Sequence, residues 1–223
     1  MSHKWKFLAM LILAVLVAAC GGGPTAQKTA KEMARRLPQV RTVMGRVEIQ
    51  VGQDLLKDEL WVQRPSFLRA ETADGPKEYK DMIVVLNETE AWYYVPALDV
   101  TMIADRQTFQ PEVGTLTGSN LLEAMPEEIQ AALSKADAFT YVGREKMAGR
   151  DVHHMEMNLP EAVGILPAGV LTLWLDQETY YPLRVKTPGG LEITFTDVRF
   201  NQEIDPKTFI FVPPPGMEVR RID

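Results

Sequence analysis

From residue 40 onward the sequence repeats one pattern, short segments in which successive side chains belong to opposite faces of an extended chain. In the first segment, Val43, Val47 and Ile49 fall on one face, whereas Arg46 and Glu48 fall on the other. Residues that favour turns separate the segments at short intervals, which is typical of antiparallel strands joined by hairpins. About eleven such strands predict a mainly β (α+β) fold in which one antiparallel sheet curls into an unclosed barrel.

Two stretches have helical spacing instead. Residues 25–37 place Ala30 and Met33 on one apolar stripe, and Pro38 ends the stripe because proline lacks the amide donor that a helix needs. Residues 120–136 repeat the helical period in the middle of the strands. We expect both helices to lie over the concave face of the sheet. The apolar positions of the second helix are Leu121, Leu122, Met125, Ile129 and Leu133.

The N-terminal segment is not expected to belong to the folded domain. Lys4 and Lys6 precede thirteen consecutive apolar residues, too few to span a bilayer but typical of a secretory signal. The apolar run ends at Cys20, and residues 16–20 resemble a bacterial lipobox. A lone cysteine at this position favours lipidation over a stray thiol behind an ordinary signal. The predicted regions are a lipoprotein signal peptide (1–19), a lipidated flexible tether (20–24) and one lipid-binding domain (25–223).

Composition limits the partners of the mature chain. The full sequence carries 24 Lys and Arg against 30 Asp and Glu, and loss of Lys4 and Lys6 with the signal changes the net charge from −6 to −8. An acidic chain is a poor ligand for nucleic acid and for anionic headgroups. The covalent lipid on Cys20 is therefore expected to hold the protein on the extracytoplasmic face of a bacterial membrane, inner or outer. Cys20 is the only cysteine, which excludes an internal disulfide.

Pro65 marks a corner between two expected strands. Proline ends ladder pairing and restricts the residue before it, so Arg64 is expected at a strand end, on the same face as Leu60 and Val62. Two interpretations follow. Arg64 is either a solvated strand-end arginine or a latch that fastens a segment lying across that apolar face.

Three motifs resemble the LolA/LolB superfamily of lipoprotein carriers and acceptors. Residues 60–65 (Leu-Trp-Val-Gln-Arg-Pro) resemble its Leu-Trp-Val-x-Arg-Pro strand, and residues 91–96 (Ala-Trp-Tyr-Tyr-Val-Pro) resemble its Trp-x-Tyr-x-Pro strand. Residues 209–216 resemble its closing Phe-x-Phe-x-Pro-Pro-x-Gly, and residues 209–212 are expected to form the last strand. The motifs come in the family's order over most of the mature chain. The resemblance implies an unclosed antiparallel barrel that encloses an apolar cavity for acyl chains, with helices over its concave side.

The resemblance also implies roles for particular residues. Arg64 matches the arginine that fastens the lid, Leu68 falls near the cavity mouth, and residues 121–136 are the expected lid helix. Aromatic and methionine side chains suit an adaptable apolar lining, although plain core packing explains each of them as well. The expected cavity residues are Leu60, Trp61, Val62, Leu68, Met82, Val84, Trp92, Tyr94 and Met102.

The sequence carries no signature of an enzyme, a metal site or a cofactor site. The Gly-x-Ser-x-Gly elbow, the phosphate-binding glycine loop and the His-Glu-x-x-His pair are all missing. His153 and His154 are adjacent on an expected strand, so they point to opposite faces and do not chelate one metal. Asp176 and Glu178 fall in an expected turn, which favours solvated carboxylates over acid–base chemistry.

The sequence therefore predicts an exported, lipid-anchored protein, not an enzyme, that binds acyl chains of lipids or lipoproteins and carries or transfers them. Two alternatives stay open. A module of the same fold would bind a protein partner in the cell envelope, as a stress sensor or scaffold does. A hydrolase would turn over lipid esters.

Overall fold

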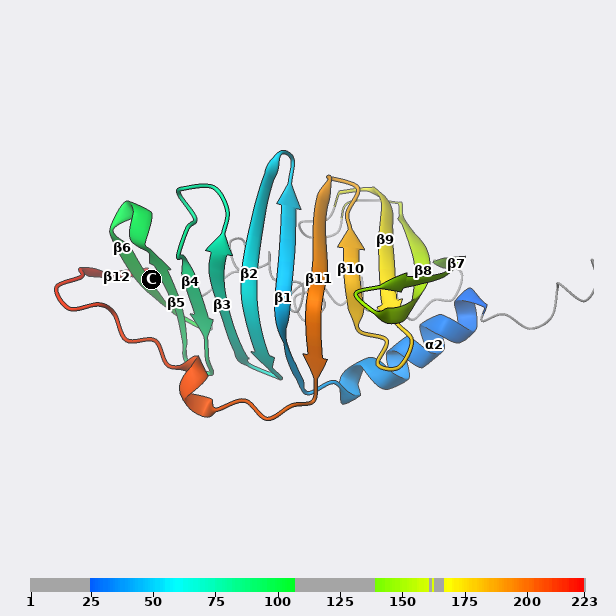
Figure 1. Ribbon diagram of the computed structural model, residues 1–223, viewed down its shortest axis with the longest axis horizontal. Helices are drawn as coiled ribbons and strands as arrows, with labels where there is room; N and C mark the ends of the chain where they lie inside the picture. The colour runs from blue at the N-terminus through cyan, green and yellow to red at the C-terminus, as the bar shows by residue number, and fades with distance from the viewer. Residues whose placement is uncertain (1–24, 107–138, 161, 163–166, 223) are drawn as a thin grey trace, which may run out of the picture.

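The computed structural model describes residues 25–106, 139–160, 162 and 167–222, and these form one twelve-stranded sheet with a helix beside it (Figure 1). The strand order is β12-β6-β5-β4-β3-β2-β1-β11-β10-β9-β8-β7. Strands β12 and β7 are separate edges, so the sheet does not close. Neighbouring strands are antiparallel except for β12 and β6, which are parallel. The predicted unclosed, mainly β architecture is confirmed.

The strand bounds lie within a few residues of the alternating segments of the sequence. The strands are β1 (Thr42–Val51), β2 (Asp54–Gln63), β3 (Phe67–Asp74), β4 (Ile83–Leu86), β5 (Glu90–Val95), β6 (Val100–Asp105), β7 (Phe139–Met147), β8 (Arg150–Leu159), β9 (Gly169–Asp176), β10 (Pro182–Lys186), β11 (Leu191–Phe200) and β12 (Val219–Ile222). The described residues also contain one α-helix, α2 (Ala26–Arg36), and three short 3-10 turns, η1 (Leu37–Gln39), η2 (Pro96–Leu98) and η5 (Pro206–Phe209).

Alternation gives the sheet two chemically different faces. The core face carries Val47, Leu60 and Phe195, each at most 1% exposed, and one hydrophobic cluster extends along it from β6 to β7. The outer face carries charged pairs such as Arg46 and Glu59, whose nearest charged atoms are 3.6 Å apart. A slip of one residue would exchange the faces, so burial of one face fixes the register. We call β2–β6 the first wing and β7–β10 the second wing, with β1 and β11 between them.

Helix α2 covers part of the second wing. Its N-cap, Thr25, accepts a hydrogen bond from the Lys28 amide at 3.2 Å. Met33 is buried, and the helix packs beside β7 (Figure 1). As predicted, the helix ends before Pro38: its last residue is Arg36, and Pro38 lies in the turn η1. None of the helices in the described ranges is both long enough and apolar enough to cross a membrane.

The C-terminal part of the sheet differs from the prediction. Residues 209–212, expected to be a closing strand, form no strand: Phe209 is the last residue of the turn η5, and residues 210–212 follow it. The prolines at 213–215 have no amide donors, so they cannot continue a ladder. Pairing resumes only in β12, where Val219 lies opposite Thr101 of β6. The prediction missed this strand and its parallel direction.

Candidate functional site

The candidate site is the core face of the first wing, where strand pairing gathers six of the nine predicted cavity residues. Val62 of β2 lies opposite Leu68 of β3. Val84 of β4 lies opposite Tyr93, and Tyr93 lies opposite Met102 of β6. The predicted residues that share this face are Leu60, Val62, Leu68, Met82, Val84 and Met102.

Burial changes across this face. Leu60, Val62 and Leu68 are only 1–2% exposed. Met82 and Met102 are partly buried, and both pack against the core cluster. Methionine side chains are flexible and polarisable, so they adapt to irregular apolar neighbours. The adaptable part of the face therefore lies at Met82, just before β4, and at Met102 on β6.

The structure does not bring Trp61, Trp92 and Tyr94 to the core face. Trp61 alternates with Leu60 and pairs with Arg69 on the opposite side of the sheet. Trp92 and Tyr94 likewise face outward, where both rings contact Phe211, with ring centroids 5.6 and 5.7 Å apart. The strands of the first wing carry apolar side chains on both faces, which is typical of a sheet that is buried on both sides. Composition alone therefore does not show which apolar side chains belong to the core face and which to the outer face.

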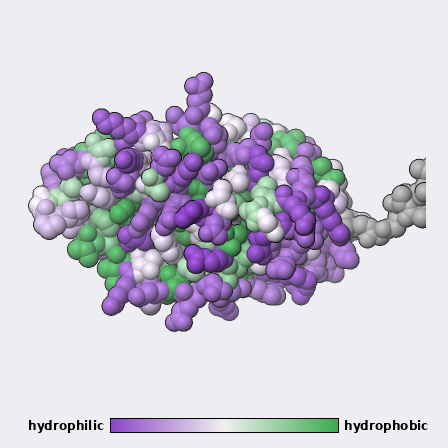
Figure 2. All heavy atoms as spheres, in the orientation of Figure 1, coloured by the Kyte–Doolittle hydropathy of each residue, from purple (hydrophilic) through white to green (hydrophobic). Residues whose placement is uncertain are grey.

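The outer cover is the segment of residues 206–212, which we call the strap. It runs along the ends of β3 to β5 (Figure 1). Phe209 packs on Phe67 with ring centroids 5.3 Å apart, and Arg69 Nη1 donates a hydrogen bond to the Thr208 carbonyl at 3.1 Å. The closing motif of the sequence thus holds the outer face. Figure 2 shows this end of the molecule with hydrophobic atoms at the surface, in keeping with the exposed Ile210 and Val212.

Arg64 has a partner that the sequence did not predict. Its Nη1 donates a hydrogen bond at 3.1 Å to the carbonyl of Leu37, just after helix α2. The carbonyls at a helix end have no intrahelical donors, and Pro38 guarantees such an end here. This is the signal that could have indicated the contact. Arg64 therefore ties the end of the N-terminal helix to the end of β2.

Several predicted residues lie outside the described residues. These are the lipidation site Cys20 and the lid-helix positions Leu121, Leu122, Met125, Ile129 and Leu133. Their roles, and the fastening of a lid by Arg64, stay predictions.

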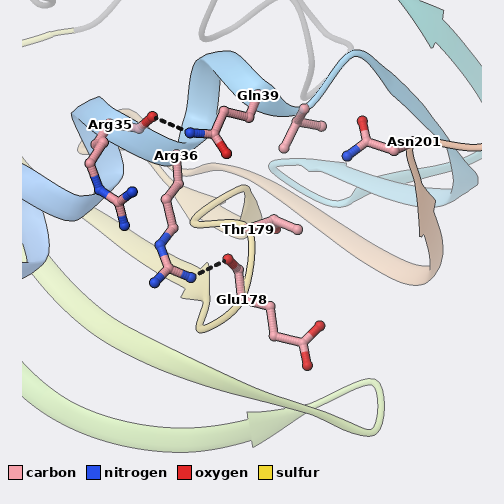
Figure 3. A pocket seen from close by; sticks show the side chains of 7 residues that line it. Arg35, Arg36, Gln39, Glu178, Thr179 and Asn201 are labelled. Atoms are coloured by element: carbon pink, nitrogen blue, oxygen red, sulfur yellow. Dashed lines mark hydrogen bonds between the residues drawn. The ribbon is translucent and has the colours of Figure 1, made fainter.

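A polar recess of about 310 Å³ lies beside the end of α2 (Figure 3). Its arginines already have partners, because Arg35 and Arg36 both pair with Glu32, at 2.6 and 3.1 Å. Arg36 Nη1 also donates a hydrogen bond to the Glu178 carbonyl at 3.0 Å. The recess therefore serves to dock α2 on the turn between β9 and β10. Its lining residues are Arg35, Arg36, Gln39, Val40, Glu178, Thr179 and Asn201.

The two adjacent histidines face opposite ways, as predicted. His153 is buried, its Nδ1 lies 3.3 Å from the Tyr141 hydroxyl, and its ring packs on Tyr180. Burial lowers the pKa of His153, and the charge of Arg144 lowers it further. His154 stacks on the outer-face ring of Trp174. In the ranges that the structure describes, no three His, Cys, Asp or Glu side chains are grouped as a metal site requires.

The prediction that Asp176 is solvated is wrong. Its side chain is only 2% exposed and pairs with Arg150 at 2.5 Å. Asp176 Oδ1 also accepts hydrogen bonds from the Glu178 amide and from the amide and hydroxyl of Thr179. Burial acts to raise the pKa of Asp176, but the bonds from Arg150 and Thr179 outweigh it and the pKa is lowered. Asp176 organises the turn, whereas Glu178 is solvated as expected, at 85% side-chain exposure.

The sequence has a distant relative of unassigned function. No family model matches the chain. The chain is 22% identical over 223 residues to the uncharacterized protein MJ0687 of Methanocaldococcus jannaschii. The match covers 98% of this chain but only 61% of the length of that relative.

Solved structures share the architecture at low sequence identity. An uncharacterized conserved protein from Thermus thermophilus aligns with a TM-score of 0.59 and 12% identity, over 87% of this chain and 99% of that one. The Mycobacterium tuberculosis lipoprotein LppX gives 0.54 and 12%, over 82% and 99%. Pseudomonas aeruginosa MucB, solved in complex with MucA, gives 0.52 and 14%, over 82% and 61%. These likenesses establish the shared fold.

Proposed function

We propose, from the premise that this chain has the fold of the LolA/LolB-like superfamily, that it binds acyl chains of lipids or lipoproteins and carries or transfers them. The observation that carries the proposal is the continuous apolar core face of the first wing, with Met82 and Met102 at its partly buried side. A sixteen-carbon chain removed from water is stabilised by roughly 12 kcal/mol, at about 0.8 kcal/mol per methylene. An apolar face of this kind needs no catalytic group to retain such a ligand.

We further propose that the protein is exported and that an acyl anchor on Cys20 tethers it to the membrane. The support is the apolar N-terminal run that ends at the only cysteine of the chain. Labelling of cells with radioactive palmitate should mark the wild-type protein and not the Cys20→Ala variant. Equal labelling of the two would remove the anchor from the proposal.

Arg64 is proposed to act as a latch at one end of the apolar face. Arg64 lies two residues beyond Val62, just after the end of β2, and its hydrogen bond holds Leu37 there. A hydrogen bond to a charged group contributes about 1.5–3 kcal/mol, far less than burial of a long acyl chain. Ligand entry is therefore strong enough to displace the latch. Whether Arg64 also fastens the lid helix of residues 121–136 stays a prediction from the sequence.

The test is mass spectrometry of organic extracts from folded protein expressed in the secretory compartment. The Cys20→Ala protein should yield a lipid at about one molecule per chain, and adding Arg64→Leu should change that occupancy. Adding Arg46→Leu, an exposed arginine on the outer face, is the matched control and should leave occupancy unchanged. A lipid-free extract from well-folded protein would contradict the proposal.

A second candidate is a module that binds a protein segment. It is favoured by the likeness to MucB, whose solved structures include a complex with MucA. This candidate predicts a stoichiometric protein partner and no co-purifying lipid.

A further inference from the structure

Asp58 is a carboxyl group set into the apolar core face of the first wing. It lies on β2 between Leu56 and Leu60, in register with the buried side chains on either side. The residue is 4% exposed, and its cross-strand neighbours, Val47 on β1 and Thr72 on β3, are 0% and 3% exposed. Burial of a carboxyl among apolar side chains costs stability unless hydrogen bonds or charges compensate it.

The compensation that the described residues supply to Asp58 is incomplete. Burial raises the pKa of the carboxyl, and a hydrogen bond with the Thr72 side chain opposes this rise. Oδ1 is buried and has no hydrogen-bond partner among the described residues. In the same ranges no Lys, Arg or His forms an ion pair with it: the neighbouring Lys57 belongs to the outer face and approaches Glu48 at 3.8 Å.

The buried carboxyl of the second wing, Asp176, differs from Asp58 in the number of its hydrogen-bond partners. Asp176 is as deeply buried but receives one guanidinium and three further donors. Buried polar groups in native proteins are nearly always satisfied in this way. Asp58 therefore has the spare acceptor capacity that a binding site needs and a structural carboxylate does not.

Two β-bulges flank Asp58. The β2–β3 register shifts between Lys57 and Asp58, which leaves Ala73 as the extra residue opposite them. The β1–β11 register shifts between Arg46 and Val47, the cross-strand neighbour of Asp58, with Thr196 as the extra residue. Bulges re-aim side chains and are over-represented next to functional sites. Two of them beside one unsatisfied carboxyl indicate a built feature of the sheet.

We propose that Asp58, supported by Thr72, is a polar subsite on the apolar face that accepts a hydrogen bond from a hydroxyl or ammonium group at the polar end of an acyl ligand. This inference rests on the proposed function and adds the class of ligand. Asp58 lies four residues from Val62, about 13 Å at roughly 3.3 Å per residue, so the acyl chain would extend from Asp58 along Leu60 and Val62.

The experiment compares two ligands with the same acyl chain, monolauroylglycerol with free hydroxyl groups and methyl laurate with none. Each displaces a fluorescent fatty-acid probe from the Cys20→Ala protein. We expect monolauroylglycerol to bind about tenfold more tightly, as one satisfied hydrogen bond on a buried acceptor predicts. A lauroyl ester of choline has an ammonium with no N–H donor, whereas 2-aminoethyl laurate has an ammonium with donors. Comparing these two esters with monolauroylglycerol distinguishes an ammonium from a hydroxyl source.

The Asp58→Leu variant should lose the preference while it keeps or improves its affinity for methyl laurate, and Thr72→Val should weaken the preference. Glu59→Leu, the adjacent acidic residue on the outer face, is the matched control and should keep it. Asp58→Leu removes the unsatisfied Oδ1 but also the hydrogen-bond partner of Thr72, so the two effects oppose each other and the change in melting temperature should be small. Asp58→Ala, which also removes the acceptor, serves if the leucine variant does not fold.

The outcomes separate this inference from the proposed function. Equal affinities for the two ligands, or a preference that survives in Asp58→Leu, would overturn the polar subsite while acyl binding stands. Failure of the probe and of both ligands to bind would overturn acyl binding and the subsite together.

Discussion

The two wings of the sheet differ in which segment covers them and in how their buried carboxyl groups are paired. In the second wing, α2 lies against the sheet end, and the buried polar groups His153 and Asp176 have partners within the fold. In the first wing, the strap lies on the outer face, while the core face carries adaptable methionines and the incompletely satisfied Asp58. The buried carboxylate of the second wing is fully paired, which is typical of a group that stabilises the fold. The Oδ1 of Asp58 in the first wing has no such partner among the described residues, and from this difference we infer a ligand subsite there.

The largest effect is expected from a cavity in the second wing. Leu173 is 1% exposed and lies between Met155 and Val185. Leu173→Ala should lower the free energy of unfolding by about 2–5 kcal/mol, measured by urea denaturation, and leave the affinity for a fatty-acid probe within twofold. The control is Thr172→Ala on the outer face. If Leu173→Ala stays stable but no longer binds the probe, the ligand binds in the second wing. That result would contradict the division of the sheet into a stabilising wing and a binding wing.

A smaller effect is expected from the strap. Phe211→Ala removes the ring that packs on Trp92 and Tyr94, and should cost about 1–2 kcal/mol and speed proteolysis within residues 206–212. Val212→Ala, at a side chain that is 76% exposed, should change stability by less than about 0.5 kcal/mol. Acyl affinity should be the same in both variants. Its loss in Phe211→Ala alone would show that the outer face belongs to the binding site.

The smallest effect is expected from pH. Because burial lowers the pKa of folded His153 below its ordinary value of 6.5, the unfolded chain takes up a proton first as pH falls. The contribution of His153 is fully favourable above pH 6.5 and is lost as pH falls from there toward the lowered pKa. Melting temperatures at pH 7.5 and 5.5 should therefore differ less in His153→Gln than in the wild type. Identical differences would mean that His153 does not set this response.

Much of the fold could be predicted because the period of the apolar pattern is local. The strands, the helix before Pro38 and the opposite orientations of His153 and His154 all follow from counting along the chain. Counting along the chain does not predict which segment covers each face of the sheet, because that segment is distant in the sequence. Trp92 and Tyr94 are apolar and belong to a binding motif in the resemblance, yet the strap that they contact lies more than a hundred residues away in the sequence.

The site residues show the same division. The sequence places Arg64 at a strand end and leaves open whether it is solvated or bound, because its contact with Leu37 arises only through tertiary packing. Burial of Asp176 depends on Arg150 from a neighbouring strand, which the turn sequence does not reveal. Asp58 is predictable from the sequence, since it occupies an apolar position between Leu56 and Leu60 in a strand with a clear period of two.

The most direct test of the account is to locate the ligand on the sheet. A palmitate analogue with a diazirine in its acyl chain is irradiated with the Cys20→Ala protein, and the labelled residues are mapped by peptide mass spectrometry. We predict labels on core-face residues of the first wing, namely Leu60, Val62, Leu68, Val84 and Met102. Labels confined to Trp61, Trp92 and Tyr94 on the outer face, or to the second wing, would contradict the account.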